Sequence, residues 1–196
     1  KSGTNTDDDQ GLFGRTLSAD IHDLTLADAR ITGYDCSGGI VGENNGTVTR
    51  CRVASDVTIH AVQNFAYYHG GIAGQNREFI SHCISAATLT IADNITNCDC
   101  YGAIAGENTG DNTCTGALED NLAIGATVPA AYNNWHGAIC GGNIGGTLAR
   151  NYYYNCTVAG EQNATGKGCN DADVTDNEGA VPALLTQSGD TYTIDS

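Results

Sequence analysis

Two glutamates stand at equivalent positions of a repeated phrase and could form a catalytic carboxylate pair. Glu43 lies in "GGIVGEN" and Glu107 in "GAIAGEN", and Gln75 holds the same position in the phrase between them. If each phrase belongs to one turn of a stacked β-structure, the two carboxylates are two turns, or about 10 Å, apart. That separation overlaps the spacing of the acid–base pair in inverting glycosidases. The competing interpretation is that both are solvated side chains beside a turn on an acidic surface.

Histidines and tyrosines form a second set of candidates, for ligand binding rather than catalysis. His69 and His136 share one column of the repeat with Ser37 and Tyr101. We expect this column to face outward if the isoleucine column described below faces inward. The two histidines are then too far apart to share one metal ion. The candidate ligand-binding residues at this corner are Tyr67, His69, Tyr101 and His136.

Further aromatic residues occur near the same corners, in "FAYYHG", "NNWHG" and "RNYYYN". Exposed rings on a rigid scaffold could stack on sugars or contact a protein partner. Alternatively, the rings fill the core or cap the stack, and strand parity places Tyr68 and Trp135 inward with the isoleucines.

The acidic segment "NDADVTDNE" offers a candidate Ca²⁺ site with Asp171, Asp173 and Asp176. It lacks the glycine at the sixth position of an EF-hand loop, and a solvated loop is the competing interpretation. We expect no other metal and no cofactor. There is no HExxH, and "GGNIGG" from Gly141 lacks the lysine and the following helix of a phosphate-binding loop.

The nine cysteines do not have zinc-site spacing, because no CxxC occurs. Cys51 and Cys83 occupy equivalent repeat positions, which favours small buried apolar packing. Local disulfides, such as Cys156 with Cys169, are an open alternative.

Charge and hydropathy restrict the partners. Eight Lys and Arg stand against 23 Asp and Glu among 196 residues, a formal charge of −15. Such a surface repels phosphate groups, so we expect neither nucleic acid nor an anionic membrane surface as a partner. No apolar run approaches the roughly 18 residues that span a bilayer. The opening "KSGTNTDDDQ" has no secretion-signal pattern, and we expect the chain to be a segment of a longer protein.

A repeat positions all these residues. Its phrases begin at Gly38, Gly70, Gly102 and Gly137, which are 32, 32 and 35 residues apart. An insertion around residues 111–115 accounts for the longer spacing. The isoleucine column is Ile40, Ile72, Ile104 and Ile139, and the asparagine column is Asn44, Asn76, Asn108 and Asn143.

Two later columns follow the phrase, and these two columns are three residues apart in every repeat. The apolar column is Val48, Ile80, Leu118 and Leu148, and the next is Cys51, Cys83, Asn121 and Asn151. A degenerate first copy begins with "GLFG" at Gly11 and places Ile21 and Leu24 in these two columns.

Short runs rich in Val, Ile and Thr, divided by Gly, Asn and Asp turns, predict an all-β fold. We expect a parallel β-solenoid (β-helix) of about five coils, with roughly three short strands in each 32-residue coil. Equivalent residues would stack about 4.8 Å apart, giving an apolar isoleucine ladder and a hydrogen-bonded asparagine ladder. The expected organisation is an N-terminal extension (1–10), a degenerate capping repeat (11–37), the repeat solenoid (38–169) and a C-terminal cap and extension (170–196).

The repeated core resembles the GLUG repeat family, named for its Gly-Leu-x-Gly motif. It reads "GLFG", "GIVG", "GIAG", "AIAG" and "AICG", with Ala103 and Ala138 replacing the first glycine in the last two. The asparagine after the core and a later "NC"-like element are present in "GENNGTVTRC" and "REFISHC". The resemblance covers roughly residues 11–156. Proteins of this family are large exported bacterial proteins, including adhesin-like surface proteins.

The resemblance implies a bacterial cell-surface or extracellular location, and a host or bacterial surface protein or a glycan as the partner. It supplies no catalytic residues. We therefore expect a non-enzymatic repeat segment that serves as an adhesive, partner-binding or stalk module. A polysaccharide-binding or polysaccharide-cleaving β-helix is the alternative, and an enzyme of this kind would need two or more carboxylates converging in an open groove.

Overall fold

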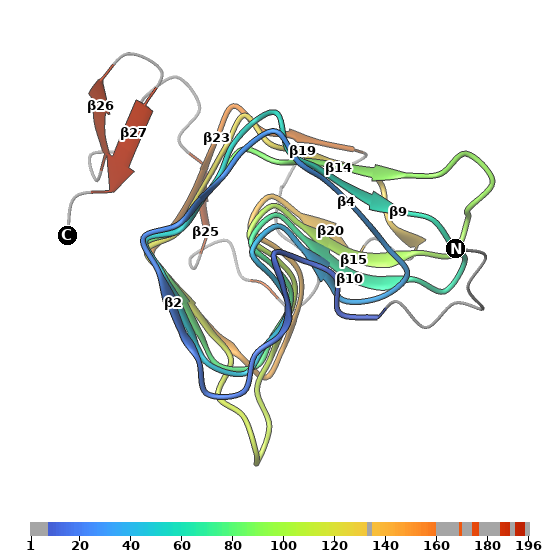
Figure 1. Cartoon of the computed structure of the whole chain (residues 1–196), viewed down its shortest axis with the longest axis horizontal. Helices are drawn as coiled ribbons and strands as arrows, with labels where there is room; N and C mark the ends of the chain where they lie inside the picture. The colour runs from blue at the N-terminus through green and yellow to red at the C-terminus, as the bar shows by residue number, and fades with distance from the viewer. Residues whose placement is uncertain are drawn as a thin grey trace.

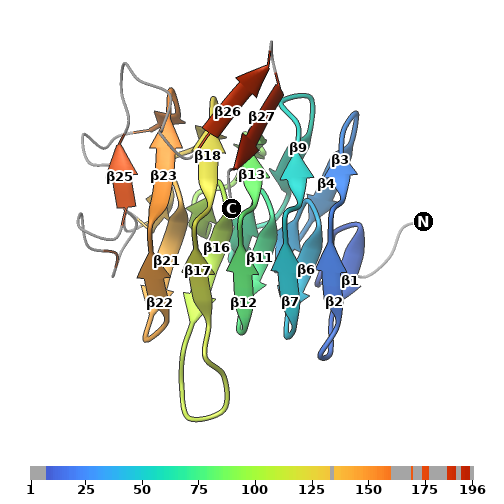
Figure 2. The same cartoon turned by 90° about the vertical axis from the view of Figure 1, so that its left-hand side faces the viewer.

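The chain is a β-solenoid of about four turns with about 32 residues per turn, which confirms the predicted fold. This computed structural model describes residues 8–132, 135–159, 169, 174–176, 185–188 and 191–194. Figure 1, which looks down the stack, shows the successive turns superimposed on one another. Figure 2 shows their strands side by side, with the strands of the first turn at one end of the stack. Most of the predicted N-terminal extension (1–10) and C-terminal cap (170–196) lies outside the described residues.

Five parallel sheets run along the stack, so a turn contains five short strands rather than the three that we expected. Sheet A contains β5 (Ser37–Gly38), β10 (Tyr67–Gly70), β15 (Asp99–Gly102) and β20 (His136–Gly137). Sheet B contains β1 (Phe13–Arg15), β6 (Val41–Asn44), β11 (Ala73–Asn76), β16 (Ala105–Thr109) and β21 (Cys140–Ile144). Sheet C contains β2 (Asp20–His22), β7 (Thr47–Thr49), β12 (Phe79–Ser81), β17 (Ala117–Glu119) and β22 (Thr147–Ala149).

The remaining strands complete each turn. Sheet D contains β3 (Thr25–Leu26), β8 (Arg52–Val53), β13 (Ile84–Ser85), β18 (Leu122–Ile124), β23 (Asn151–Tyr154) and β25 (Val174–Asp176). Sheet E contains β4 (Arg30–Gly33), β9 (Thr58–Ala61), β14 (Thr88–Ile91), β19 (Thr127–Val128) and β24 (Thr157–Val158). A separate antiparallel hairpin pairs β26 (Leu185–Ser188) with β27 (Thr191–Ile194).

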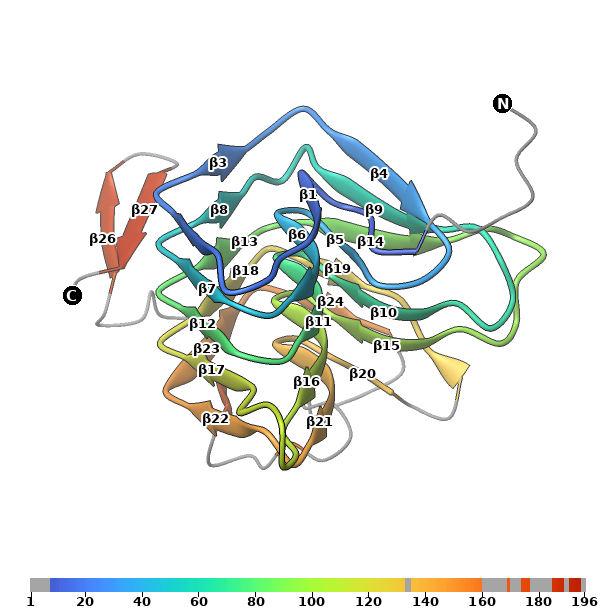
Figure 3. The same cartoon turned by 60° about the horizontal axis from the view of Figure 1, so that its bottom comes forward.

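Strand pairing places equivalent residues of neighbouring turns on one another, as Figure 3 shows for the stacked coils. In sheet C, Ile80 pairs with Val48 on one side and with Leu118 on the other. Ile21 pairs with Val48, which confirms the predicted alignment of the degenerate first copy. The apolar columns therefore form continuous ladders along the core.

The predicted isoleucine ladder is present in the core. The N–H groups of Ile40, Ile72 and Ile104 donate to the carbonyls of the next isoleucine in the column, over 3.0, 2.9 and 3.0 Å. All four side chains are at most 1% exposed. Full burial of an isoleucine side chain contributes roughly 1.5–3 kcal/mol to stability, so this column is a principal element of the core.

The glycine frame of each phrase marks a tight corner between sheets A and B. A Cβ added to Gly38 would lie 2.2 Å from the carbonyl oxygen of Val41, and one added to Gly74 would lie 2.3 Å from the carbonyl carbon of Cys36. The backbones of the two sheets thus touch where only glycine fits. Figure 1 shows the result, because β10, β15 and β20 run back toward the middle of the outline.

Left-handed residues other than glycine turn the chain between sheets C and D. The column consists of Asp23, Arg50, His82, Asp120 and Arg150, with φ between 51° and 57°. Their side chains also meet across turns: Arg50 Nε lies 2.7 Å from Asp23 Oδ1, and Arg150 Nε lies 2.6 Å from Asp120 Oδ1. Both ion pairs are exposed, so they add little stability. This corner divides what looks like one β-run into two strands.

The insertion in the third repeat forms a projecting loop after β16. Gly110 and Thr115 close it with an antiparallel bridge. The loop extends beyond the outline of the other turns in Figure 1, which confirms the predicted cause of the 35-residue spacing.

Candidate functional site

The asparagine column is a continuous ladder, as predicted. The Nδ2 groups of Asn44, Asn76 and Asn108 each donate to Oδ1 of the next asparagine, in every case over 2.8 Å. The same nitrogens also donate to backbone carbonyls at the corner between sheets B and C, as Asn76 does to Glu78 over 3.0 Å. Because the side chains of Asn44, Asn76 and Asn108 are fully buried, these bonds satisfy groups that would otherwise be costly.

Thr16 ends this ladder in the first turn. Its Oγ1 donates to Oδ1 of Asn44 over 3.1 Å and accepts from the backbone N–H of Asn45 over 2.9 Å. A hydroxyl therefore satisfies the end of the ladder, and the sequence pattern did not identify this residue.

A second ladder lies at the corner between sheets C and D, where cysteine and asparagine occupy the same column. Each side chain of this column reaches a backbone carbonyl of the preceding turn. The contacts are Cys51 to Ile21 (3.9 Å), Cys83 to Val48 (3.7 Å), Asn121 to Ile80 (3.1 Å) and Asn151 to Leu118 (2.7 Å). The two cysteines are buried, as predicted. Their thiols also occupy the position from which the amides of Asn121 and Asn151 donate in the later turns.

The two thiols of this ladder are in contact. A hydrogen bond from the Cys83 thiol lowers the pKa of Cys51 to about 7. Burial raises the pKa of Cys83 itself well above its ordinary value. The pair thus consists of one thiol that ionises more readily than usual and one that stays protonated.

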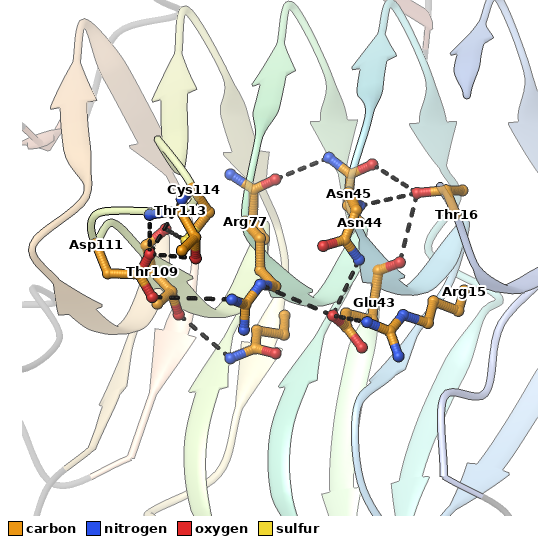
Figure 4. A network of polar contacts seen from close by, with 12 residues as sticks. Arg15, Thr16, Glu43, Asn44, Asn45, Arg77, Thr109, Asp111, Thr113 and Cys114 are labelled. Carbon is orange, nitrogen blue, oxygen red and sulfur yellow. Dashed lines mark hydrogen bonds and ion pairs between the residues drawn. The ribbon is translucent and has the colours of Figure 1, made fainter. Parts of the chain in front are cut away.

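The candidate carboxylates are buried, which corrects the expectation that Glu43 and Glu107 are solvated. Glu43 is 8% exposed and Glu107 is 4% exposed. Glu43 Oε1 lies 3.1 Å from Arg15 Nη2 and accepts from Asn45 Nδ2 over 2.9 Å. Figure 4 shows Glu43 held between Arg15 and Arg77.

Glu107 has its own partners, so the two carboxylates do not converge. Its Oε1 accepts from Gln75 Nε2 over 2.9 Å and from Thr109 Oγ1 over 2.7 Å. In the pairing register, Gln75 lies directly between Glu43 and Glu107. An amide therefore stands where an inverting glycosidase would hold its water.

Arg77 links this polar row to the projecting loop. Its Nε lies 3.9 Å from Glu43 Oε1 and its Nη2 lies 3.8 Å from Asp111 Oδ2. Oδ1 of Asp111 accepts from Oγ1 of Thr113 over 2.6 Å and from the backbone N–H groups of Thr113 and Cys114 over 2.6 and 3.0 Å, and these contacts lower its pKa. Figure 4 places these residues beside one another along the stack. The loop is thereby tied to sheet B.

The histidine–tyrosine column faces inward, so the expectation that it faces outward is wrong. Ser37, His69 and Tyr101 are fully buried, and His136 is 2% exposed. The residues before the first three members have positive φ: 36° at Cys36, 65° at Tyr68 and 62° at Cys100. The corner between sheets A and B separates this column from the isoleucines, because β10 ends at Gly70 and β11 begins at Ala73, so parity counted across the corner fails.

The buried rings of this column carry polar atoms that find no strong hydrogen-bond partner within the described part of the chain. The rings of His69 and Tyr101 stack with their centroids 4.9 Å apart. Both ring nitrogens of His69 lack hydrogen bonds, and the hydroxyl of Tyr101 has only the weakly bonding thiol of Cys98 as a partner. Burial lowers the pKa of His69 to about 3 and raises that of Tyr101. His69 is therefore neutral at physiological pH.

His136, by contrast, is fully bonded. Its Nδ1 accepts from the N–H of Ala131 over 3.2 Å, and its Nε2 lies 2.6 Å from the carbonyl of Ala159. Of the four candidate ligand-binding residues, only Tyr67 is partly exposed. His69, Tyr101 and His136 are too deeply buried to contact a ligand at the surface.

Tyr68 and Trp135 are partly exposed and do not belong to the core cluster, so their expected inward position is also wrong. An added Cβ on Gly142 would lie 2.6 Å from Cε3 of Trp135. Gly142 pairs with Glu107, so the indole covers the next position of the carboxylate row.

The candidate Ca²⁺ site lies mostly outside the described residues, whereas the candidate disulfide lies within them. Within the described ranges, no group of three or more His, Cys, Asp and Glu side chains could hold a metal ion. Asp171 and Asp173 lie outside those ranges, and only the backbone of Asp176 is described, in β25. No disulfide joins any of the nine cysteines, all of which lie in the described ranges, so a bond between Cys156 and Cys169 is absent.

Comparison of the chain with protein-family models, with curated proteins and with solved structures gives no match. In the described part of the chain, no helix is long and apolar enough to cross a bilayer. The function of this chain must therefore be inferred from its side-chain ladders and from its exposed surface.

Proposed function

We propose that this chain is a non-enzymatic β-solenoid segment of an exported bacterial surface protein, serving as a stalk that presents adhesive or partner-binding surfaces. The observation that carries the proposal is that the repeated asparagine side chains form hydrogen bonds with one another. The asparagines bond to their copies in neighbouring turns, so the repeat maintains the stack rather than a pocket.

The carboxylate row supports a structural role in the same way. Glu43 and Glu107 are held by separate donors, and Gln75 separates them. A carboxylate that accepts hydrogen bonds from neighbouring turns fixes the register of sheet B. Cleavage of a polysaccharide would require these acceptors to leave their partners.

Enzymatic activity is tested with the purified chain on a panel of acidic and neutral polysaccharides, with reducing-end and unsaturated-product assays. We expect no turnover above a heat-denatured control. Turnover that disappears in both Glu43→Gln and Glu107→Gln would overturn the proposal, provided that both variants keep the wild-type circular dichroism spectrum.

The surface location rests on the resemblance to GLUG repeats and on the acidic surface. An antibody against the chain should label intact cells of the source bacterium, and external protease should remove the signal. Labelling that requires permeabilised cells would contradict this part of the proposal.

A second candidate function, glycan binding, is favoured by exposed aromatic rings at the turns between sheets E and A. Phe65 is 57% exposed and Tyr132 is 52% exposed. Aromatic faces on a rigid scaffold can stack on sugar rings. A glycan array tests this: binding should weaken at least tenfold in Phe65→Ala with Tyr132→Ala and stay unchanged in Leu17→Ala, an exposed apolar control at the first turn. No binding to any glycan would reject this candidate.

A further inference from the structure

A buried thiol faces the interior in the last turn of sheet B. Cys140 is 1% exposed and pairs with Ala105, and Ala105 in turn pairs with Ala73. Alanine occupies this column in the two preceding turns, so the thiol is a local feature and not part of the repeat.

Cys169, which follows the last turn, returns to this thiol. Its Sγ lies 4.0 Å from the carbonyl oxygen of Cys140. The two thiols are also hydrogen-bond partners, and Cys169 packs against the core while remaining partly exposed. Cys156, the nearer cysteine in the sequence, instead directs its Sγ to the carbonyl of Tyr154 over 3.6 Å.

We propose that Cys140 and Cys169 form a disulfide under oxidising conditions and thereby fix Cys169 to the last turn. The setting in which this occurs rests on the proposed export of the protein, because disulfides persist outside the reducing cytosol. The bond formation itself depends only on the positions of the two thiols.

The chemistry requires a small disulfide as the oxidant, such as glutathione disulfide. The thiolate of the accessible Cys169 attacks one sulfur of the oxidant, forming a mixed disulfide and releasing one glutathione thiolate. Cys140 then loses its proton and attacks Sγ of Cys169, which releases the second glutathione thiolate. The two cysteine thiols are oxidised by two electrons in total, and their two protons pass through solvent to the two released thiolates.

Burial of Cys140 has a kinetic and a thermodynamic consequence. Burial raises the pKa of this thiol well above its ordinary value, so the second step should be slow compared with the first. The finished bond closes a loop between residues that are 29 positions apart. Restricting the unfolded chain in this way should raise the melting temperature by roughly 5–15 °C.

Peptide mapping distinguishes the possible pairings. The purified chain is incubated with glutathione disulfide, alkylated without reduction, and digested with chymotrypsin and trypsin. Cleavage after Trp135, Arg150, Tyr154 and Lys167 separates Cys140, Cys156 and Cys169 into three different peptides. We expect the peptide that begins at His136 to be linked to the peptide that begins at Gly168, together with the rise in melting temperature.

Two variants make this test decisive. Cys169→Ser should abolish both the linkage and the thermal shift, whereas Cys156→Ser should retain both. A bond from Cys169 to Cys156, a bond between Cys51 and Cys83 in place of the expected one, or glutathione that stays on Cys169 would overturn the proposal. Because the experiment uses the isolated chain, its outcome is independent of whether the protein reaches a cell surface.

Discussion

Nδ2 of Asn76 donates to Oδ1 of Asn108 over 2.8 Å, although the two residues are 32 positions apart in the chain. The same nitrogen also lies 3.2 Å from the carbonyl of Ala117, at the next corner of the same neighbouring turn. One side chain therefore joins two turns through a neighbouring amide and through the backbone. This relationship repeats along the stack and accounts for the fixed asparagine of each phrase.

Removal of an interior ladder residue should be costly. In Asn76→Ala, the amides of Asn44 and Asn108 each lose a partner in a buried position, so we expect a loss of about 3–5 kcal/mol in the free energy of unfolding. Thr16→Val, at the end of the ladder, is the matched control and should lose only about 1 kcal/mol. Urea titration followed by circular dichroism measures both, and equal losses would contradict a continuous ladder.

Extension of the second ladder should stabilise the protein. Asn at position 83 would stand one turn before Asn121 and could donate to the carbonyl of Val48, which the thiol of Cys83 approaches only to 3.7 Å. We expect Cys83→Asn to raise the free energy of unfolding by about 1 kcal/mol and Cys83→Ala to lower it. A loss in the asparagine variant as large as that in the alanine variant would show that this column does not accept an amide.

The hydroxyl of Tyr101 should destabilise the core that surrounds it. It is buried with only the weakly bonding thiol of Cys98 as a partner, so its removal costs little. Tyr101→Phe should therefore raise the free energy of unfolding by about 1 kcal/mol, as measured by urea titration. Destabilisation by a similar amount would show that the hydroxyl makes a stronger hydrogen bond than a thiol provides.

Stability should fall at acidic pH through protonation of His69 in the unfolded chain. Burial lowers the pKa of this group to about 3 in the folded state, whereas the unfolded value is about 6.5. At acidic pH the unfolded chain then binds more protons than the folded chain. The resulting loss of stability is absent above about pH 6.5, grows as the pH falls, and levels off below about pH 3. Relative to His69→Leu, the wild type should lose about 3 kcal/mol between pH 7 and pH 4.

Urea titrations across this pH range measure the difference between the two proteins, which removes the contribution of the many carboxyl groups. Parallel curves for the wild type and His69→Leu would refute a neutral, buried His69.

The sequence allowed the solenoid and its two principal ladders to be predicted, because stacking requires the same side chain at the same place in each turn. Ile72 and Asn76 each have an equivalent residue at the same position of the other repeats, and both occupy the predicted columns. The number of strands per turn could not be predicted. The corner between sheets C and D uses left-handed Arg50, His82 and Arg150, whose residue types do not signal a turn.

The position of the candidate site residues was less predictable, for related reasons. The corner between sheets A and B, after Gly70 and after Gly102, breaks the parity on which the outward placement of His69 and Tyr101 depended. The burial of Glu43 follows from its contact with Arg15, which lies in the degenerate first turn and shares no motif with it. Long-range partners of this kind leave no local signal in the sequence.

The distances between stacked asparagine side chains in a crystal structure of the chain test the central claim most directly. The account predicts Oδ1–Nδ2 distances close to 2.8 Å from Asn44 through Asn143, with the backbone of Val41 paired in parallel to that of Ala73. Asparagine side chains that are separated from one another, or antiparallel pairing of these strands, would contradict it.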